Sequence, residues 1–239
     1  ETFDAQGEIL VPFAIESSLS GVGKRVSKGE ALWYEREFTV PKQWKGKNVL
    51  LHFGAVDWHA EVFVNDVFLG EHKGGYDPFS FDVTSALKKS GKQVLRVKVQ
   101  DATDNSFQPR GKQCIINAGI WYTPVTGIWQ TVWMEPVTPS YVRNYYAVSD
   151  IDKGEIAFDV DASPAAGDVV KVALLEGGEG YSAENPSQTV LAEAVVENGK
   201  AIVKVDDVKT WSPDSPYLYG VKVWVERNGK VVDSVNGYT

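Results

Sequence analysis

The chain has 239 residues, of which 43% are hydrophobic, and its 24 basic and 32 acidic side chains give a net charge of −8. This length fits one large or two ordinary domains with real hydrophobic cores. No cluster of basic residues stands out along the sequence, so neither nucleic acid nor an anionic membrane is expected as a partner. The single cysteine, Cys114, excludes an internal disulfide and is expected to be a small buried hydrophobe.

The start of the sequence and its apolar runs bear on location. No apolar run approaches the roughly 18–20 residues of a membrane helix. The chain begins at Glu1, and its only methionine is Met134. Removal of an export signal would produce such a start, and so would excision of a fragment. A periplasmic or secreted location is therefore favoured over a cytoplasmic one.

Strand patterns fill the first half of the chain, where short polar or glycine-rich joints separate runs of strand length and composition. The expected strands are 32–40, 48–53, 59–64, 79–84, 93–100 and 128–135, with one helical turn at Ser85–Lys89. Within this half, the run 62–84 adds a tight reversal at Asn65-Asp66, because both residues tolerate positive φ. The glycine pair Gly74-Gly75 gives the backbone further freedom before the next strand.

The same rhythm continues beyond Pro136–Pro139, where the composition shifts. The expected strands there are 141–148, 154–161, 168–176, 188–196, 200–205, 217–226 and 230–235. Asn198-Gly199 and Asn228-Gly229 lie between alternating runs and are strong two-residue hairpin signals. Seven short strands in about a hundred residues are typical of an immunoglobulin-like sandwich. We therefore predict an all-β chain of two domains, 1–136 and 137–239, the first a jelly-roll-like sandwich.

Five segments of the chain form a recognisable series. They are VPFAIESSLSGVG at 11–23, LWYEREFTVP at 32–41, FGAVDWHAEVFVNDVFLGEHKGGYDPFSFDVT at 53–84, WYTPVTGIWQTVW at 121–133 and WSPDSPYLY at 211–219. In this order they resemble glycoside hydrolase family 2, and the resemblance covers almost the whole chain. It implies that the first domain is a galactose-binding-like jelly roll, that the second is an immunoglobulin-like β-sandwich, and that both precede a TIM barrel.

The resemblance also implies a function. In the family, the barrel supplies a nucleophilic glutamate and an acid/base glutamate for retaining hydrolysis of the β-galactosidase or β-glucuronidase kind. The acid/base glutamate usually follows an asparagine, and this sequence has no Asn-Glu pair. We therefore expect the non-catalytic N-terminal part of such an enzyme, inactive alone, with the barrel and a galactoside or glucuronide as partners. The alternative hypothesis is a free-standing carbohydrate-binding or adhesion module.

Acidic side chains lie near several loops of the first domain. Hydrolysis of a glycoside needs two carboxyl groups about 5–9.5 Å apart across the scissile bond. We expect no catalytic residue here and assign Asp57, Glu61, Asp77, Asp101 and Asp104 to solvated loops. Cysteine, histidine and carboxylate residues show no metal-ligand spacing, and no phosphate or dinucleotide motif occurs, so neither a metal nor a cofactor is expected.

The tryptophans are the pool of groups that could stack on a sugar ring. Trp33, Trp129 and Trp133 lie in apolar strand contexts and are expected in the core, whereas Trp211 is expected to plug the second domain. Trp58, in a polar Asp-Trp-His setting, is a better ligand candidate.

A second group of candidates lies in the segment 101–122, which is long for a compact β domain, and such loops are often functional. Its arginine, lysine and amide side chains can donate to hydroxyls or to a carboxylate. Family members place an acidic residue shortly before the pair that matches Gly127-Ile128. Trp121 holds that place here, so stacking is expected to replace the carboxylate contact; the alternative is a loop that packs on the barrel. The candidate carbohydrate-contacting residues are Trp58, His59, Asp104, Arg110, Lys112, Trp121 and Tyr122.

Overall fold

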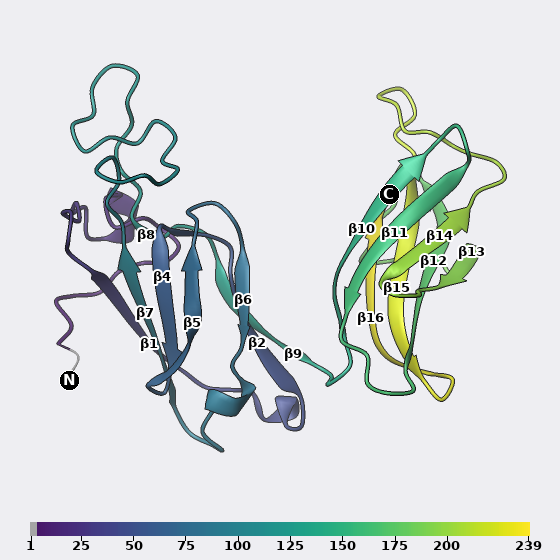
Figure 1. Ribbon diagram of the computed structural model, residues 1–239, viewed down its shortest axis with the longest axis horizontal. Coiled ribbons are helices and arrows are strands. Elements are labelled where there is room, and N and C mark those ends of the chain that lie inside the picture. Colours follow the sequence, from purple (N-terminus) through teal and green to yellow (C-terminus); the bar gives the residue numbers. More distant parts are fainter. Residues whose placement is uncertain (1–3) are drawn as a thin grey trace. The chain divides into compact units, whose positions relative to one another are not determined.

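The computed structural model describes residues 4–239 and divides the chain into two compact units, Glu1–Pro136 and Val137–Thr239 (Figure 1). Both units are built from β-strands, which confirms the predicted all-β class. The helical turn expected at Ser85–Lys89 is a single 3-10 turn at Thr84–Ala86, because the backbone is already extended at Leu87. Across the described range, no helix has the length and apolar character needed to cross a membrane.

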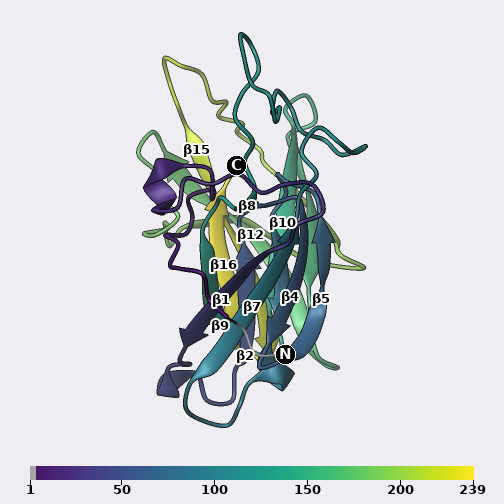
Figure 2. The ribbon, with the colours of Figure 1, turned by 90° about the vertical axis from the view of Figure 1, so that its left-hand side faces the viewer.

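The first unit is a sandwich of antiparallel sheets. Its strands are β1 (Leu32–Phe38), β2 (Asn48–Phe53), β3 (Val56–Asp57), β4 (His59–Val64), β5 (Val67–Lys73), β6 (Phe79–Asp82), β7 (Gln93–Gln100), β8 (Gly127–Ile128) and β9 (Val132–Val137). One sheet has the order β1-β7-β4-β5, which Figure 2 shows side by side, a second has the order β6-β2-β9, and β3 pairs with β8 in a small third sheet. Alternate residues of both sheets, such as Leu51, Phe53, Val62 and Val97, fill the core between them.

The predicted reversal at Asn65-Asp66 is confirmed, with φ values of 50° and 66°. The Asn65 side chain also ties this hairpin to the start of β7. Its amide donates to the Ala86 carbonyl and to the Gln93 side chain, both at 2.8 Å, and its oxygen accepts from the amide of Val94 at 3.0 Å. One residue type therefore satisfies both the turn conformation and the polar groups at this end of the sandwich.

The second unit is an immunoglobulin-like sandwich, as predicted. Its strands are β10 (Val142–Asp150), β11 (Glu155–Ala162), β12 (Val169–Gly178), β13 (Val190–Val195), β14 (Lys200–Lys204), β15 (Leu218–Arg227) and β16 (Lys230–Tyr238). The sheets have the orders β10-β11-β14 and β13-β12-β15-β16. Positive φ at Asn198, Gly199, Asn228 and Gly229 confirms both predicted hairpin turns. The hydroxyl of Tyr219 accepts from the Lys209 amide at 2.7 Å and donates to the Asp207 carbonyl at 3.2 Å, a tyrosine corner.

The core assignment of two first-domain tryptophans was wrong. Trp33 and Trp133 are 42% and 47% exposed, because each occupies an outward position of the strand pleat. The Trp33 ring contacts the Phe63 ring in a tilted arrangement, with centroids 6.1 Å apart. The Trp133 ring stacks on His52, with centroids 4.0 Å apart. Trp129 is half-buried, and its indole nitrogen donates to the Gly75 carbonyl at 2.7 Å. The expected strand 128–135 accordingly breaks into β8 and β9 around it.

Candidate functional site

A long loop, residues 101–126, closes one end of the first unit between β7 and β8 (Figure 1). An N-terminal segment packs along it. The Arg25 guanidinium donates to the Ile115 carbonyl at 2.5 Å and to the Asn117 side chain at 2.6 Å. The Lys28 ammonium donates to the Asn105 carbonyl at 3.4 Å. These bonds join segments about 90 residues apart in the sequence and give the loop a defined conformation.

Three carboxylates lie beneath the loop, and the expectation that Asp57 and Asp101 are solvated was wrong. Asp57 is 2% exposed and Asp101 is 5% exposed. Asp101 accepts hydrogen bonds from the Thr103 amide at 2.7 Å, from Gln108 at 2.6 Å and from the Thr126 hydroxyl at 3.0 Å. Polar groups of the loop thus replace the water that these acids would otherwise require.

The third acid, Glu16, accepts from the Thr126 amide at 2.9 Å, and burial raises its pKa despite that bond. Burial likewise raises the pKa of Asp57 to about 7; a hydrogen bond from Gln113 opposes the rise, and the charges of Asp101 and Glu16 add to it. One oxygen each of Glu16 and Asp57 is buried without a hydrogen-bond partner in the described part of the chain. A substantial fraction of Asp57 is therefore protonated at neutral pH.

Gln113 couples this acidic base to the loop above it. Its amide donates to Asp57 Oδ2 at 3.0 Å, and its oxygen accepts from the Val125 amide at 2.6 Å. Gly75 closes the other side, because a Cβ at this position would lie 2.6 Å from the Asp57 carboxyl. The clamp between Asp57 and Gln113 was not predicted from the sequence, where its one signal is the glycine pair that contains Gly75.

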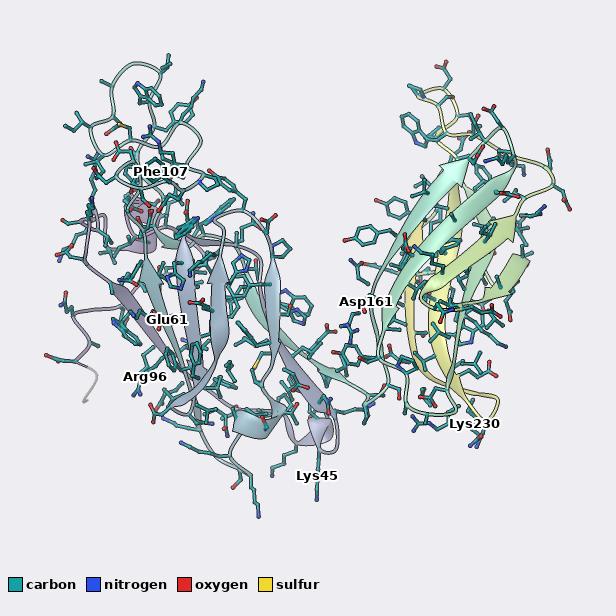
Figure 3. All side chains as sticks on the ribbon, in the orientation of Figure 1. Lys45, Glu61, Arg96, Phe107, Asp161 and Lys230 are labelled. Carbon is teal, nitrogen blue, oxygen red and sulfur yellow. The ribbon has the colours of Figure 1, made fainter. Side chains whose placement is uncertain are left out.

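The outer part of the loop brings four of the sequence-predicted residues together as two cation–aromatic pairs. The Arg110 guanidinium lies 5.6 Å from the Trp121 ring centre, and the Lys112 ammonium lies 5.7 Å from the Tyr122 ring centre. Trp121 and Tyr122 are 42% and 62% exposed. The amide of Tyr122 donates to the Lys112 carbonyl at 2.8 Å, so the two strands of the loop are held together. Figure 3 labels Phe107, a fully exposed ring on the same loop.

Asp104, another of the candidate residues, bonds to groups within the loop. It accepts from the Cys114 thiol at 2.9 Å and from the Ile115 amide at 3.2 Å, and it lies 3.6 Å from Arg110. The Cys114 hydrogen bond, the Ile115 amide and the Arg110 charge together lower the pKa of Asp104. Asp104 therefore holds the loop. Cys114 is half-buried and bonded to a carboxylate, which corrects its expected role as a buried hydrophobe.

Trp58 and His59 form a separate pair at the start of β4. Their rings meet edge to face with centroids 6.3 Å apart, and His59 Nε2 lies 2.7 Å from Glu71. Within residues 4–239, no hydrogen bond or ring contact joins either side chain to the loop 101–126. The same range contains no group of three or more His, Cys, Asp or Glu residues arranged to hold a metal ion.

Comparison with known proteins places both units. Residues 20–121 match the family model "Glycosyl hydrolase 2 galactose-binding domain-like", and residues 140–239 match "Glycosyl hydrolases family 2". The chain belongs to glycoside hydrolase family 2, and it matches the N-terminal, non-catalytic part of its relatives.

Those relatives are considerably longer proteins. A β-galactosidase of Thermoanaerobacter pseudethanolicus is 30% identical over 84% of this chain and 27% of its own length. A β-galactosidase of Bacteroides ovatus is 31% identical over 90% of this chain and 25% of its own length. A solved β-glucuronidase of Ruminococcus gnavus matches the fold with a TM-score of 0.73 at 22% identity, over 95% of this chain and 38% of that one. The chain thus spans about a quarter of the length of the first two relatives.

Proposed function

We propose that this chain serves as the accessory part of a retaining glycosidase that acts on β-galactosides or β-glucuronides, and that its loop 101–126 contributes to the carbohydrate site. The observation that carries the proposal is the pair of exposed aromatic rings, Trp121 and Tyr122, held by cations and backbone bonds over a closed polar base. The names of the relatives supply the substrate classes.

The loop offers the two kinds of contact that a sugar requires. An aromatic ring supplies a large apolar area at low entropic cost, suited to the C–H face of a pyranose. Arg110 and Lys112, beside those rings, donate to hydroxyl or carboxylate oxygens. Asp57 is buried and Gln113 is half-buried, and both act by positioning the loop.

The same geometry supports a non-catalytic role for this chain. Retaining hydrolysis needs two accessible carboxyl groups roughly 5–5.5 Å apart. Asp57 and Asp101 are buried and bonded to loop groups, and Asp104 is tied to Cys114 and Ile115. Large exposed apolar side chains on the same loop, Phe107 and Ile116 among them, fit packing against a further domain such as the family's barrel.

A binding and turnover experiment tests the proposal. The purified chain is assayed on nitrophenyl β-galactoside and β-glucuronide, and its amide NMR signals are followed as methyl β-galactoside or glucuronic acid is added. We expect no turnover and shifts confined to the loop, which W121A/Y122A abolishes. W133A is the matched control, because Trp133 is similarly exposed but lies on β9. Turnover by the chain alone, or shifts that survive W121A/Y122A, would overturn the proposal.

A further inference from the structure

Two segments at the outer part of the candidate site carry cations and no acidic residues, although acids lie beneath them. Residues 105–134 contain no Asp or Glu but include Arg110 and Lys112. Residues 17–29 also contain no Asp or Glu and include Lys24, Arg25 and Lys28. Acid-free stretches with cations also occur at 38–56 and 83–100, so what distinguishes these two is that the fold brings them together.

The fold places these two stretches side by side. Arg25 bonds to the Ile115 carbonyl and the Asn117 side chain, and Lys28 bonds to the Asn105 carbonyl. Figure 1 shows the purple N-terminal segment beside the base of the teal loop. We call Arg25, Lys28, Arg110 and Lys112 the basic rim. The grouping of these four residues could not be predicted from the sequence, because they come from two segments that are far apart along the chain.

The charge of the basic rim is largely uncompensated. Arg25 and Lys28 donate to carbonyl and amide oxygens, and Lys112 faces the Tyr122 ring; none of the three has a carboxylate partner among residues 4–239. Only Arg110 has one, Asp104 at 3.6 Å. By contrast, Lys98 is paired with Glu61 at 2.6 Å and Arg227 with Asp168 at 2.7 Å. The rim therefore retains a positive potential that a bound anion would neutralise.

We propose that the basic rim, together with Trp121 and Tyr122, binds the anionic group of an acidic saccharide, either a uronate carboxylate or a sulfate ester. This inference rests on the proposed carbohydrate-binding role of the loop and adds the charge of the ligand. The cations and the exposed rings lie within contact distance of each other, so one sugar unit can stack on a ring while its anionic group meets the neighbouring cation. A long polyanion such as nucleic acid fits less well, because the rest of the chain is more acidic still.

A titration with four probes tests the proposal. The chain is titrated with trigalacturonate, a sulfated galactotriose, neutral galactotriose and a single-stranded oligothymidylate, with amide NMR shifts as the readout. At low salt we expect the acidic saccharides to bind about ten-fold more tightly than the neutral one. That advantage should disappear near 1 M salt, where the screening length falls to roughly 3 Å. Which of the two acidic probes binds identifies the source of the anionic group.

Charge variants assign the effect to the rim. We expect R25Q/K112Q to remove the ten-fold preference, and K112Q alone, which breaks no hydrogen bond within the described chain, to remove much of it. K45Q/K230Q makes the same change of charge at two lysines outside the rim, both labelled in Figure 3, one after the 3-10 turn Lys42–Trp44 and one on β16, and should keep the preference. Equal binding of neutral and acidic probes overturns this inference while the proposed function stands. Absence of all saccharide binding overturns both, and tighter binding of the oligothymidylate overturns the inference in favour of nucleic acid.

Discussion

The two domains treat their inward-facing carboxylates in opposite ways. In the second, Asp168 is held by a bidentate pair with Arg227, at 2.7 and 2.8 Å, and its side chain has no exposed area. In the first, Asp57 and Glu16 are buried without a cation, and each retains an oxygen without a partner in the described chain. A buried acid without a countercharge lowers the free energy of unfolding. Its presence beneath an ordered loop therefore indicates that it serves the function of the loop and not the stability of the domain.

The pKa values express this contrast. Burial raises the pKa of Asp57 to about 7, whereas hydrogen bonds from Arg227 and Ser140 hold the pKa of Asp168 well below its usual range. The stabilising contribution of Asp57 is complete below its unfolded pKa and is lost as pH rises through its folded pKa. That of Asp168 is present above its unfolded pKa and is lost as pH falls. The two domains should therefore lose stability at opposite ends of the pH range.

A side chain at Gly177 should destabilise the second domain more than any other substitution considered and leave the first domain unchanged. A Cβ at Gly177, beside the irregularity between β12 and β15, would lie 1.7 Å from the Leu218 carbonyl oxygen. Because that oxygen belongs to the backbone, no rotamer change relieves the clash. We expect G177A to lower the free energy of unfolding of this domain by more than about 4 kcal/mol. Urea denaturation, followed through amide signals of each domain, measures the loss.

The control for this variant is nearby. A methyl group on the Cα of Gly180 would meet nothing within 4 Å, so G180A should change the unfolding free energy by only a few tenths of a kcal/mol. Signals of the first domain should keep their own transition in both variants. A G177A protein as stable as G180A would show that β12 does not run so close to β15 at this point.

The second prediction is the opposite pH dependence of the two domains. Between about pH 4 and pH 7, the first domain should lose about 4 kcal/mol of stability, because the pKa of Asp57 is raised by about three units and each unit is worth about 1.4 kcal/mol. The second domain should hold constant over this range and lose stability below about pH 4. Hydrogen exchange of core amides in each domain, measured across pH, separates the two.

Two variants test whether Asp57 and Asp168 cause these pH dependences. D57N should remove most of the pH dependence of the first domain and leave the second unchanged, whereas R227Q should reduce the acid sensitivity of the second alone. A first domain whose stability is flat from pH 4 to pH 8 would contradict the buried, unpaired state of Asp57.

The third prediction concerns the clamp that joins the acidic base to the loop. Q113A removes the donor to Asp57 and the acceptor of the Val125 amide. We expect a loss of about 1–3 kcal/mol, since buried polar groups are left without partners, and faster hydrogen exchange at Val125. Q188A is the control, because the Gln188 side chain is exposed and, among residues 4–239, donates just to the nearby Pro186 carbonyl. Unchanged exchange at Val125 would show that Gln113 does not hold the loop.

The sequence specified the strands and hairpins well because their signals are local. Runs of strand length and composition predicted β2, β4 and β7 with the bounds that the structure has. The turns at Asn198-Gly199 and Asn228-Gly229 follow from backbone chemistry that the two residues carry by themselves. The site was less accessible, because its geometry depends on contacts across the chain.

Asp57 and Asp101 illustrate this limit. A carboxylate in a loop is usually solvated, and nothing in the sequence near Asp57 indicates that Gln113 will cover it. The basic rim has the same origin, since Arg25 reaches Ile115 across about 90 residues. By contrast, Arg110, Lys112, Trp121 and Tyr122 were predicted as candidates because they share one long loop. Whether they contact a sugar stays a prediction.

The smallest expected effect comes from Trp211, which the sequence places as a plug of the second domain and the structure leaves 58% exposed. The ring lies at the edge of a cavity of about 300 Å³ and makes no hydrogen bond or ring contact within the described chain. We therefore expect W211A to change the unfolding free energy by less than about 0.5 kcal/mol. W224A is the comparison, because Trp224 is 7% exposed and its loss should cost roughly 3–5 kcal/mol. Near-equal losses of unfolding free energy in W211A and W224A would mean that the Trp211 ring is buried in solution and belongs to the core of the second domain.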